Sequence, residues 1–530
     1  MDISLQQKCI SINIFYYKFV LRFISIIIAL SLTACSSTPQ SPPLASNEFS
    51  CKTDLHIKEP LQQLERTATQ SEFLPVHNNK DAYQWRLAFV DQAKSTLDVQ
   101  TFIWESDETG GLLIDRILKA ANRGVYVRIL VDDFLLAGRD GIGALINSHP
   151  NIEMRVFNPL EVRDDRMVFR GLEIVFNLSR LNHRMHNKLF IADNQAGIIG
   201  GRNIGNEYFG LGHKLNYRDF DLVVRGPLVP EITDSFNVFW NSPSSLPLEK
   251  VVGAEVLKEI QLESVQKKSR RKLNKLINQS KVLNQEFNTE VQDWNVMLED
   301  AKEKILSGKS RIIYDCPPSI DNPIPGQVSD LLGKLAMSVK KEIFFISPYL
   351  VPSEKFREGL RKLTERGVRV RILTNSLESS DSAAAVSGYA RYRNELLEMG
   401  IELHEMKADA GHTHFYKTQS STAEFLSLHA KVIIFDRRAV YAGSLNLDPR
   451  SIVWNTEIGA LIDSPELAEA MIEGFEQDLL QENSWAVRMD KDGAVFWYST
   501  KEVKSITPAR NFGQRISMFI YSLIPMENQI

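Results

Sequence analysis

The chain has 530 residues, of which 43% are hydrophobic and 24% charged, and its formal net charge at neutral pH is −4. That length allows two domains of ordinary size, and the composition is typical of a well-mixed globular protein. The small excess of acidic residues argues against broad, non-specific binding to nucleic acid.

The first 35 residues have the pattern of a targeting segment. Lys18 and Arg22 precede an apolar run over 23–32, and Leu32-Thr33-Ala34-Cys35 resembles a bacterial lipobox. That resemblance implies cleavage before Cys35 and acylation of this residue. Sorting to the outer membrane is favoured over the inner one, because Ser36 and not aspartate follows. An uncleaved anchor helix is the alternative. Either way we expect the body to lie outside the cytoplasm, on a membrane of the bacterial envelope and facing the periplasm.

Residues 36–70 open with a Pro/Ser-rich stretch and are predicted to be a tether. A mature chain would keep two cysteines, Cys51 and Cys316. An oxidising compartment permits a bond between them, and the sequence leaves open whether it forms. One pair of cysteines makes neither a metal site nor a disulfide framework.

Helix and strand patterns alternate through residues 71–250 and again through 311–480. The first half is expected to form helices over 82–93, 112–122 and 141–148, and strands over 97–104, 125–131 and 152–157. The second half is expected to form helices over 356–364 and 390–397, and strands over 343–347 and 401–406. Residues 366–373 match residues 123–130, 243 positions earlier. The repeat predicts a duplicated domain with an α/β layer architecture.

Two further segments have a distinct composition. Residues 251–310, between the halves, are polar and helix-prone, and their basic cluster 267–272 fits either anionic lipid headgroups or a solvated helix face. In the C-terminal tail, 481–530, Arg510 and Arg515 flank a run of apolar residues. That composition suits an interfacial helix, with a docked core helix as the alternative.

One motif occurs in both halves, also 243 positions apart. His186-Asn187-Lys188 followed four residues later by Asp193 returns as His429-Ala430-Lys431 with Asp436. Each copy continues, after six more residues, with Gly-x-x-Asn: Gly200-Gly201-Arg202-Asn203 and Gly443-Ser444-Leu445-Asn446. We take the histidine, lysine and aspartate of each copy as candidate catalytic residues, although both aspartates precede turns and are expected to hold backbone rather than to contact substrate.

The residue types suit a phosphoryl group. An apolar strand follows each motif lysine, and alternation along that strand is expected to put the histidine and lysine on one face. Histidine acts as nucleophile or general acid near neutral pH, while lysine and asparagine stabilise growing negative charge. Two-fold packing of the repeats would bring both motifs around one phosphate.

Other polar residues are expected to complete this site. Asn203, Asn446 and Ser444 are predicted to bind phosphate or to orient the site. Asp219 and Glu457 follow the two motifs at corresponding places and are predicted to hold the second ring nitrogens of the histidines. Asp219 is preferred to the alternative Asp221 because the two strand segments align best that way.

These residues resemble the phospholipase D superfamily, whose signature is the paired His-x-Lys-x4-Asp with Gly-x-x-Asn. The resemblance runs over nearly all of 80–490. The resemblance is most specific to bacterial cardiolipin synthases of the C type, and it is carried by the segments 97–100, 179–188, 200–205, 374–377, 388–391 and 448–451. It implies two tandem duplicated α/β/α domains packed with pseudo-two-fold symmetry around one active site. Gly201 stands where many relatives have serine, as Ser444 does in the second copy, so one hydroxyl contact is expected to be missing.

The resemblance also implies a reaction without metal or other cofactor, through a phosphatidyl-histidine intermediate. By family habit His186 is the nucleophile and His429 the acid and base, although the sequence alone does not order them. Transfer to phosphatidylglycerol makes cardiolipin. Transfer to water, as in a phospholipase D or phosphodiesterase, makes phosphatidic acid. The implied partners are the membrane and phospholipid substrates, with phosphatidylethanolamine as an alternative donor and no nucleic acid. An accessory protein is left open.

Overall fold

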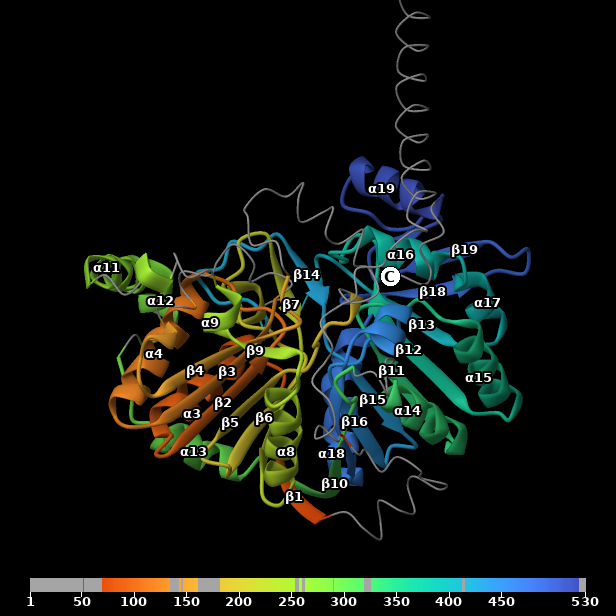
Figure 1. Ribbon diagram of the computed structural model, residues 1–530. Coiled ribbons are helices and arrows are strands. Elements are labelled where there is room, and N and C mark those ends of the chain that lie inside the picture. The colour runs from red at the N-terminus through yellow and green to blue at the C-terminus, as the bar shows by residue number, and fades with distance from the viewer. Residues whose placement is uncertain are drawn as a thin grey trace, which may run out of the picture. The chain divides into compact units, whose positions relative to one another are not determined.

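The alternation of strands and helices that the sequence predicts is present in both halves of the chain (Figure 1). The computed structural model describes residues 51, 69–133, 143, 146–160, 182–252, 257–259, 263–288, 290–318, 326–411 and 415–523. All of these belong to one compact unit, Phe49–Ile530. The predicted signal segment with Cys35 and most of the tether lie outside the described residues.

The first half forms nine strands among the described residues. They are β1 (Thr69–Val76), β2 (Thr96–Thr101), β3 (Tyr126–Asp132), β4 (Ile152–Phe157), β5 (Leu189–Ala192), β6 (Ala196–Gly200), β7 (Leu215–Arg218), β8 (Asp221–Arg225) and β9 (Ser245–Pro247). Its main helices are α3 (Asn79–Gln92), α4 (Glu108–Asn122) and α8 (Leu228–Trp240). The segment between the halves is helical, with α9 (Leu248–Val251), α11 (Glu263–Gln279), α12 (Lys281–Glu286) and α13 (Asn295–Lys302).

The second half repeats this order. Its strands are β10 (Leu306–Tyr314), β11 (Glu342–Ile346), β12 (Arg369–Asn375), β13 (Glu402–Met406), β14 (Phe425–Leu428), β15 (Val432–Phe435), β16 (Ala439–Gly443), β17 (Ile458–Asp463), β18 (Ser484–Met489), β19 (Val495–Tyr498) and β20 (Val503–Lys504). Its helices are α14 (Gln327–Ser338), α15 (Glu354–Glu365), α16 (Ala383–Ala390), α17 (Arg393–Glu398), α18 (Pro465–Leu479) and α19 (Phe512–Ser522).

One continuous sheet of 18 strands joins the halves. The first half contributes the order β9-β4-β3-β2-β5-β6-β8-β1, and the second β10-β17-β16-β15-β11-β12-β13-β18-β19-β20. The two meet where β1 pairs antiparallel with β10, Thr69 opposite Ser310. β7 and β14 form a separate parallel pair, one strand from each half.

Three hydrophobic clusters fill the layers. One packs α3 and α4 against the first half of the sheet, and another packs α14 and α15 against the second half. The third contains Ile232 and Phe236 of α8 together with Met471 and Phe475 of α18, which lie beside each other between the halves (Figure 1). This arrangement confirms the predicted fold, two α/β/α repeats.

Two local expectations need correction. The motif histidines and lysines do not lie on strands: β5 begins at Leu189 and β15 at Val432, so both pairs occupy the extended segments just before them. The helix expected over 390–397 is two helices, since α16 ends at Ala390 and α17 begins at Arg393.

The basic residues of α11 are exposed, which leaves both interpretations of that cluster open. Within the described part of the chain, no helix has both the length and the apolar character needed to span a membrane. α19 contains no buried residue, so it is not a core helix.

Candidate active site

The segment that leads to His186 runs beside the segment that leads to Glu457. Met185 and Thr456 form a parallel bridge, the His186 N–H donates to the Thr456 carbonyl at 3.0 Å, and the Thr456 N–H donates to the Arg184 carbonyl at 2.8 Å. The pairing therefore places a residue of the first motif next to an acid of the second half.

The second motif has the mirror arrangement. β14, which leads to His429, pairs parallel with β7, which leads to Asp219, and Leu428 lies opposite Arg218. The His429 N–H donates to the Arg218 carbonyl at 2.7 Å. Each histidine is thus carried by one half and placed beside the acid of the other.

The two carboxylates contact the two imidazoles crosswise. His186 Nδ1 lies 2.9 and 3.0 Å from the carboxylate oxygens of Glu457, and His429 Nδ1 lies 2.6 Å from Asp219 Oδ2. All four side chains are buried. A carboxylate that accepts the Nδ1 proton leaves Nε2 of each ring available for chemistry.

The two motif lysines lie beside the histidines. Lys188 Nζ donates to the His186 carbonyl at 2.6 Å, and Lys431 Nζ donates to the His429 carbonyl and lies 3.0 Å from His429 Nδ1. Burial lowers the pKa of Lys188 to about 7 and that of Lys431 to about 8. The charges of Lys431 and His429 act on the pKa of His186, so both motifs contribute to one electrostatic site.

The two motif asparagines differ in their contacts. Asn203 Oδ1 accepts from the Ile103 N–H at 3.2 Å, and its Nδ2 donates to the Tyr208 hydroxyl at 2.8 Å. Asn446 is buried, and its Oδ1 accepts no hydrogen bond from any described residue. A buried polar atom without a partner is costly, and it is the kind of group that a ligand satisfies.

Asp193 and Asp436 hold backbone at turns through their carboxylates. Each sits in the left-handed region, with φ of 53° and 50°, directly after its strand. The Asp193 carboxylate accepts from the backbone N–H groups of residues 94–96, and the Asp436 carboxylate from those of residues 340–342. These contacts agree with the expectation that both aspartates hold backbone, here at the starts of β2 and β11.

The sequence matches the family described as "Cardiolipin synthase, PLD-like domain" over residues 87–240 and 332–479. It is 34% identical over 475 residues to cardiolipin synthase C of Escherichia coli, covering 86% of this chain and 96% of that protein. The chain belongs to this family. A Helicobacter pylori protein described as uncharacterized is 32% identical over 441 residues, covering 83% of this chain and 85% of that one.

Among solved structures, the phosphatidylserine synthase of Haemophilus influenzae shares the fold with a TM-score of 0.51. Its sequence is 16% identical, and the match covers 81% of this chain and 91% of that one. The family membership confirms the predicted resemblance. The chain is an enzyme of phospholipid biosynthesis, a phosphatidyltransferase of the phospholipase D type.

Ser444 and Gly201 occupy equivalent positions in the two repeats. Their difference in size accounts for a glutamate, Glu457, at one site and an aspartate, Asp219, at the other. The Ser444 hydroxyl donates to a Glu457 carboxylate oxygen, so it orients that acid. At Gly201 an added Cβ would lie 2.2 Å from Asp219 Oδ1, so the shorter acid occupies the space that a serine side chain would need. The first copy, which lacks a serine hydroxyl at Gly201, therefore has aspartate beside the histidine, whereas the second copy has glutamate held by the Ser444 hydroxyl.

The two histidine–acid pairs also differ electrostatically. Burial, then the Lys188 and Lys431 charges, lowers the pKa of His186 well below its usual value, while burial raises the pKa of Glu457 well above its own. Burial also raises the pKa of Asp219, but the His429 charge and hydrogen bond outweigh it and bring the pKa down to about 2. An ionised Asp219 favours the protonated form of His429, although burial and Lys431 lower the pKa of that histidine.

Sequence patterns missed several residues around the histidines. The Tyr217 and Tyr208 rings lie 4.8 and 5.2 Å from the His429 ring, and the Phe102 ring lies 5.2 Å from the His186 ring. The Tyr217 and Tyr349 hydroxyls each donate to the Asp381 carboxylate at 2.9 Å. Tyr208 and Tyr217 lie close in sequence to Asn203 and Asp219, a proximity that could have pointed to them. Phe102, Tyr349 and Asp381 lie far from both motifs, so no motif spacing identifies them.

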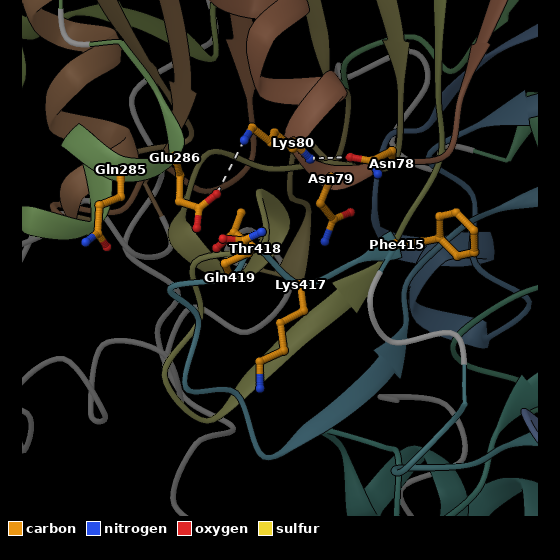
Figure 2. Close-up of a pocket in the computed structure, with 9 residues that line it drawn as sticks. All are labelled: Asn78, Asn79, Lys80, Gln285, Glu286, Phe415, Lys417, Thr418 and Gln419. Atoms are coloured by element: carbon orange, nitrogen blue, oxygen red, sulfur yellow. Dashed lines mark hydrogen bonds and ion pairs between the residues drawn. The ribbon is translucent and has the colours of Figure 1, made fainter.

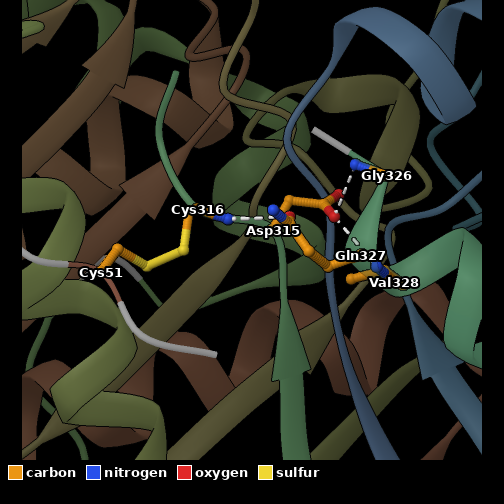
Figure 3. The surroundings of a disulfide bond; sticks show 6 residues. All are labelled: Cys51, Asp315, Cys316, Gly326, Gln327 and Val328. Carbon is orange, nitrogen blue, oxygen red and sulfur yellow. Dashed lines mark hydrogen bonds between the residues drawn. A yellow bond between two sulfur atoms is a disulfide. The ribbon is translucent and has the colours of Figure 1, made fainter. Parts of the chain in front are cut away.

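A disulfide joins Cys51 to Cys316 and answers the pairing question that the sequence left open (Figure 3). The neighbouring Asp315 accepts hydrogen bonds from the N–H groups of Gly326 and Val328 and, at 2.9 Å, from that of Glu457. The bond therefore ties the start of the described chain to Cys316, whose neighbour Asp315 supports the Glu457 backbone.

A separate polar pocket of about 240 Å³ lies between α3, α12 and the second-half loop before β14 (Figure 2). Lys80 and Glu286 pair across it at 3.4 Å, and none of the predicted site residues lines it. Among the described residues, no group of three or more histidine, cysteine, aspartate or glutamate side chains is arranged to hold a metal ion.

Proposed function

We propose that this enzyme makes cardiolipin, by moving a phosphatidyl group from a phospholipid donor to a hydroxyl of phosphatidylglycerol through a phosphatidyl-histidine intermediate. The observation that carries the proposal is the crosswise pair of buried histidines, each with a carboxylate at Nδ1 and a lysine beside it. Such a pair supplies one nucleophile and one proton donor to the same phosphodiester.

We assign the nucleophile to His186. Burial, followed by the charges of Lys188 and Lys431, lowers its pKa well below the usual value, which favours a neutral imidazole with an available Nε2 lone pair. His429 faces the ionised Asp219, which stabilises a proton on this ring and suits it to the role of general acid. The assignment agrees with the order expected from the family resemblance.

In the first step, His186 Nε2 forms a bond to phosphorus, the bond from phosphorus to the donor's alcohol oxygen breaks, and His429 gives that oxygen its proton. In the second step, His429 takes the proton of the incoming hydroxyl, whose oxygen bonds to phosphorus as the bond to His186 breaks. Lys188 and Lys431 stabilise the charge on the non-bridging oxygens in both steps. The Nδ2 groups of Asn203 and Asn446 are further candidate donors to these oxygens.

We also propose that the mature chain is anchored through an acylated Cys35 and faces the periplasm. The lipobox sequence supports the anchor. The Cys51–Cys316 disulfide supports an oxidising compartment, because such bonds persist there and are rare in the cytoplasm. Phosphatidylglycerol and phosphatidylethanolamine are the donors we would test.

The test is an incubation of the enzyme with vesicles of phosphatidylglycerol, with and without phosphatidylethanolamine, followed by mass spectrometry of the lipids. His186→Ala and His429→Ala serve as controls. We expect cardiolipin from the wild type and none from either variant, and dependence on phosphatidylethanolamine would identify the donor. Phosphatidic acid without cardiolipin would reject the synthase in favour of a hydrolase of the same family.

A further inference from the structure

The C-terminal helix α19 turns its apolar stripe away from the protein. Phe512, Ile516, Phe519, Ile520 and Leu523 are spaced so that they share one helix face, and they are 74, 45, 63, 51 and 68% exposed. A surface helix of a globular protein normally buries such a stripe against its core. Here the side chains that are partly covered, such as Gln514 and Met518, lie on the other face.

This orientation is fixed by contacts with the rest of the second half. Gln514 Nε2 donates to the Leu377 carbonyl at 2.9 Å, and Arg391 donates to the Ser522 carbonyl at 2.6 Å. The Arg510 guanidinium lies 3.4 Å from the centre of the Phe425 ring. Figure 1 shows α19 lying on α16. The helix is therefore docked on its polar side, with its apolar side left uncovered.

The surrounding surface combines exposed apolar side chains with positive charge. Eight of the thirteen exposed large hydrophobic residues in the described chain lie within 503–523. The same segment carries Lys504, Arg510 and Arg515 and no acidic residue, although the whole chain has a net charge of −4. Lys504 pairs with Glu502 at 3.1 Å, so Arg510 and Arg515 supply the positive charge beside the stripe. α11, the other basic helix, exposes charged side chains without such a stripe.

The surface is also close to the catalytic residues. The Leu377 carbonyl accepts from Gln514 of α19, and the Ser380 carbonyl accepts from Arg510 just before the helix. This segment leads directly to Asp381, whose carboxylate accepts from the Tyr217 hydroxyl. The Tyr217 ring in turn lies 4.8 Å from the His429 ring. Phe425, under Arg510, begins the strand β14 that leads to His429.

We propose that α19 is an interfacial helix that inserts its apolar stripe into a bilayer containing anionic phospholipid and so holds the active site at the lipid surface. The inference rests on the proposed function only in taking phospholipids as the substrates. Apolar residues beside basic ones match acyl chains beside anionic headgroups. A second copy of the chain is a poorer partner, because two segments with the same positive charge would face each other.

Insertion can be measured on the full chain with Phe519→Trp, using vesicles of phosphatidylglycerol and phosphatidylcholine whose acyl chains carry bromine as a quencher. The matched control is Val296→Trp, at an exposed apolar position on α13. We expect quenching at position 519 beyond that of the control and weaker quenching without phosphatidylglycerol. Equal quenching in both tryptophan variants would overturn the inference. It would also be overturned if Phe519→Trp showed no quenching while sedimentation showed a wild-type dimer that Phe519→Ser converts to a monomer, because the stripe would then bind a second copy.

Activity supplies a second readout. In the double variant Phe519→Ser, Ile520→Ser we expect transfer from vesicle lipids to fall about tenfold or more, because both side chains lose their apolar insertion. Transfer from a monomeric short-chain phospholipid should stay within about twofold of the wild type. Equal losses on both substrates would show a merely structural helix. Quenching does not need turnover, so the quenching measurement is repeated with the inactive His186→Ala variant. If position 519 is quenched but the wild-type enzyme makes no cardiolipin, the proposed function is rejected and the membrane insertion of α19 stands.

Discussion

Asn in place of Asp219 should impair one proton transfer and spare the nucleophile. Asp219 Oδ2 lies 2.6 Å from His429 Nδ1, and its pKa falls from 3.8 to about 2 despite complete burial. The His429 charge and hydrogen bond are the largest causes that lower this pKa, ahead of the Lys431 and Arg202 charges. A shift of this size is worth roughly 2–3 kcal/mol, and because the interaction is mutual, Asp219 stabilises the imidazolium of His429 by a similar order. Its protonated fraction should therefore fall about 10- to 100-fold in Asp219→Asn.

The assay compares two donors that differ in the alcohol they release. Phosphatidylglycerol needs a proton on its departing oxygen, whereas a p-nitrophenyl phosphatidyl ester releases a stable anion. We expect Asp219→Asn to slow the first turnover on phosphatidylglycerol about 10- to 100-fold and to leave the nitrophenol burst within about threefold. Glu457→Gln should slow both, because Glu457 holds the nucleophile His186.

The matched control is Asp98→Asn, which removes another buried carboxylate, paired with Arg128 at 2.7 Å. Both donors should respond to it equally. The crosswise assignment is refuted if Asp219→Asn slows both donors alike, or if Glu457→Gln alone is sensitive to the leaving group. The second result would exchange the roles of the two histidines.

Four further outcomes are expected. Cys316→Ser should lower the melting temperature in thermal unfolding, since a disulfide closing a loop this long contributes at most about 5 kcal/mol; an unchanged value would contradict the bond. Asp193→Ala should cost about 2–3 kcal/mol in denaturant unfolding while turnover per folded molecule changes little, and a large loss of turnover would place Asp193 in the site. Gly201→Ser should slow phosphatidyl transfer about tenfold or more, by pushing the Asp219 carboxylate away from His429; full activity would show that the site has room for the added side chain. The rate should fall as pH rises through the pKa values of about 7 and about 8 of the site lysines, because their ammonium groups are lost; a flat profile there would contradict this.

Local sequence information predicted much of this protein correctly. The repeat of residues 123–130 at 366–373 indicated two domains because spacing survives duplication, and helical and strand periodicity placed most elements within a few residues. The strands predicted after Lys188 and Lys431 are present as β5 and β15. Asp193 and Asp436 were recognised as turn residues from their positions at strand ends.

The tertiary structure decided how these parts combine. Glu457 and His186 are 271 positions apart, and Asp219 and His429 are 210 apart, and each pair forms only because the β7–β14 pairing and the Met185–Thr456 bridge cross between the halves. A sequence motif shows which residue types are present, and periodicity shows which residues share a face of one helix or strand. Neither shows which of the two histidines each acid will contact, because that contact depends on how distant segments pack. For the same reason, the composition of α19 gave its apolar stripe, while only its docking on α16 shows that the stripe faces outward.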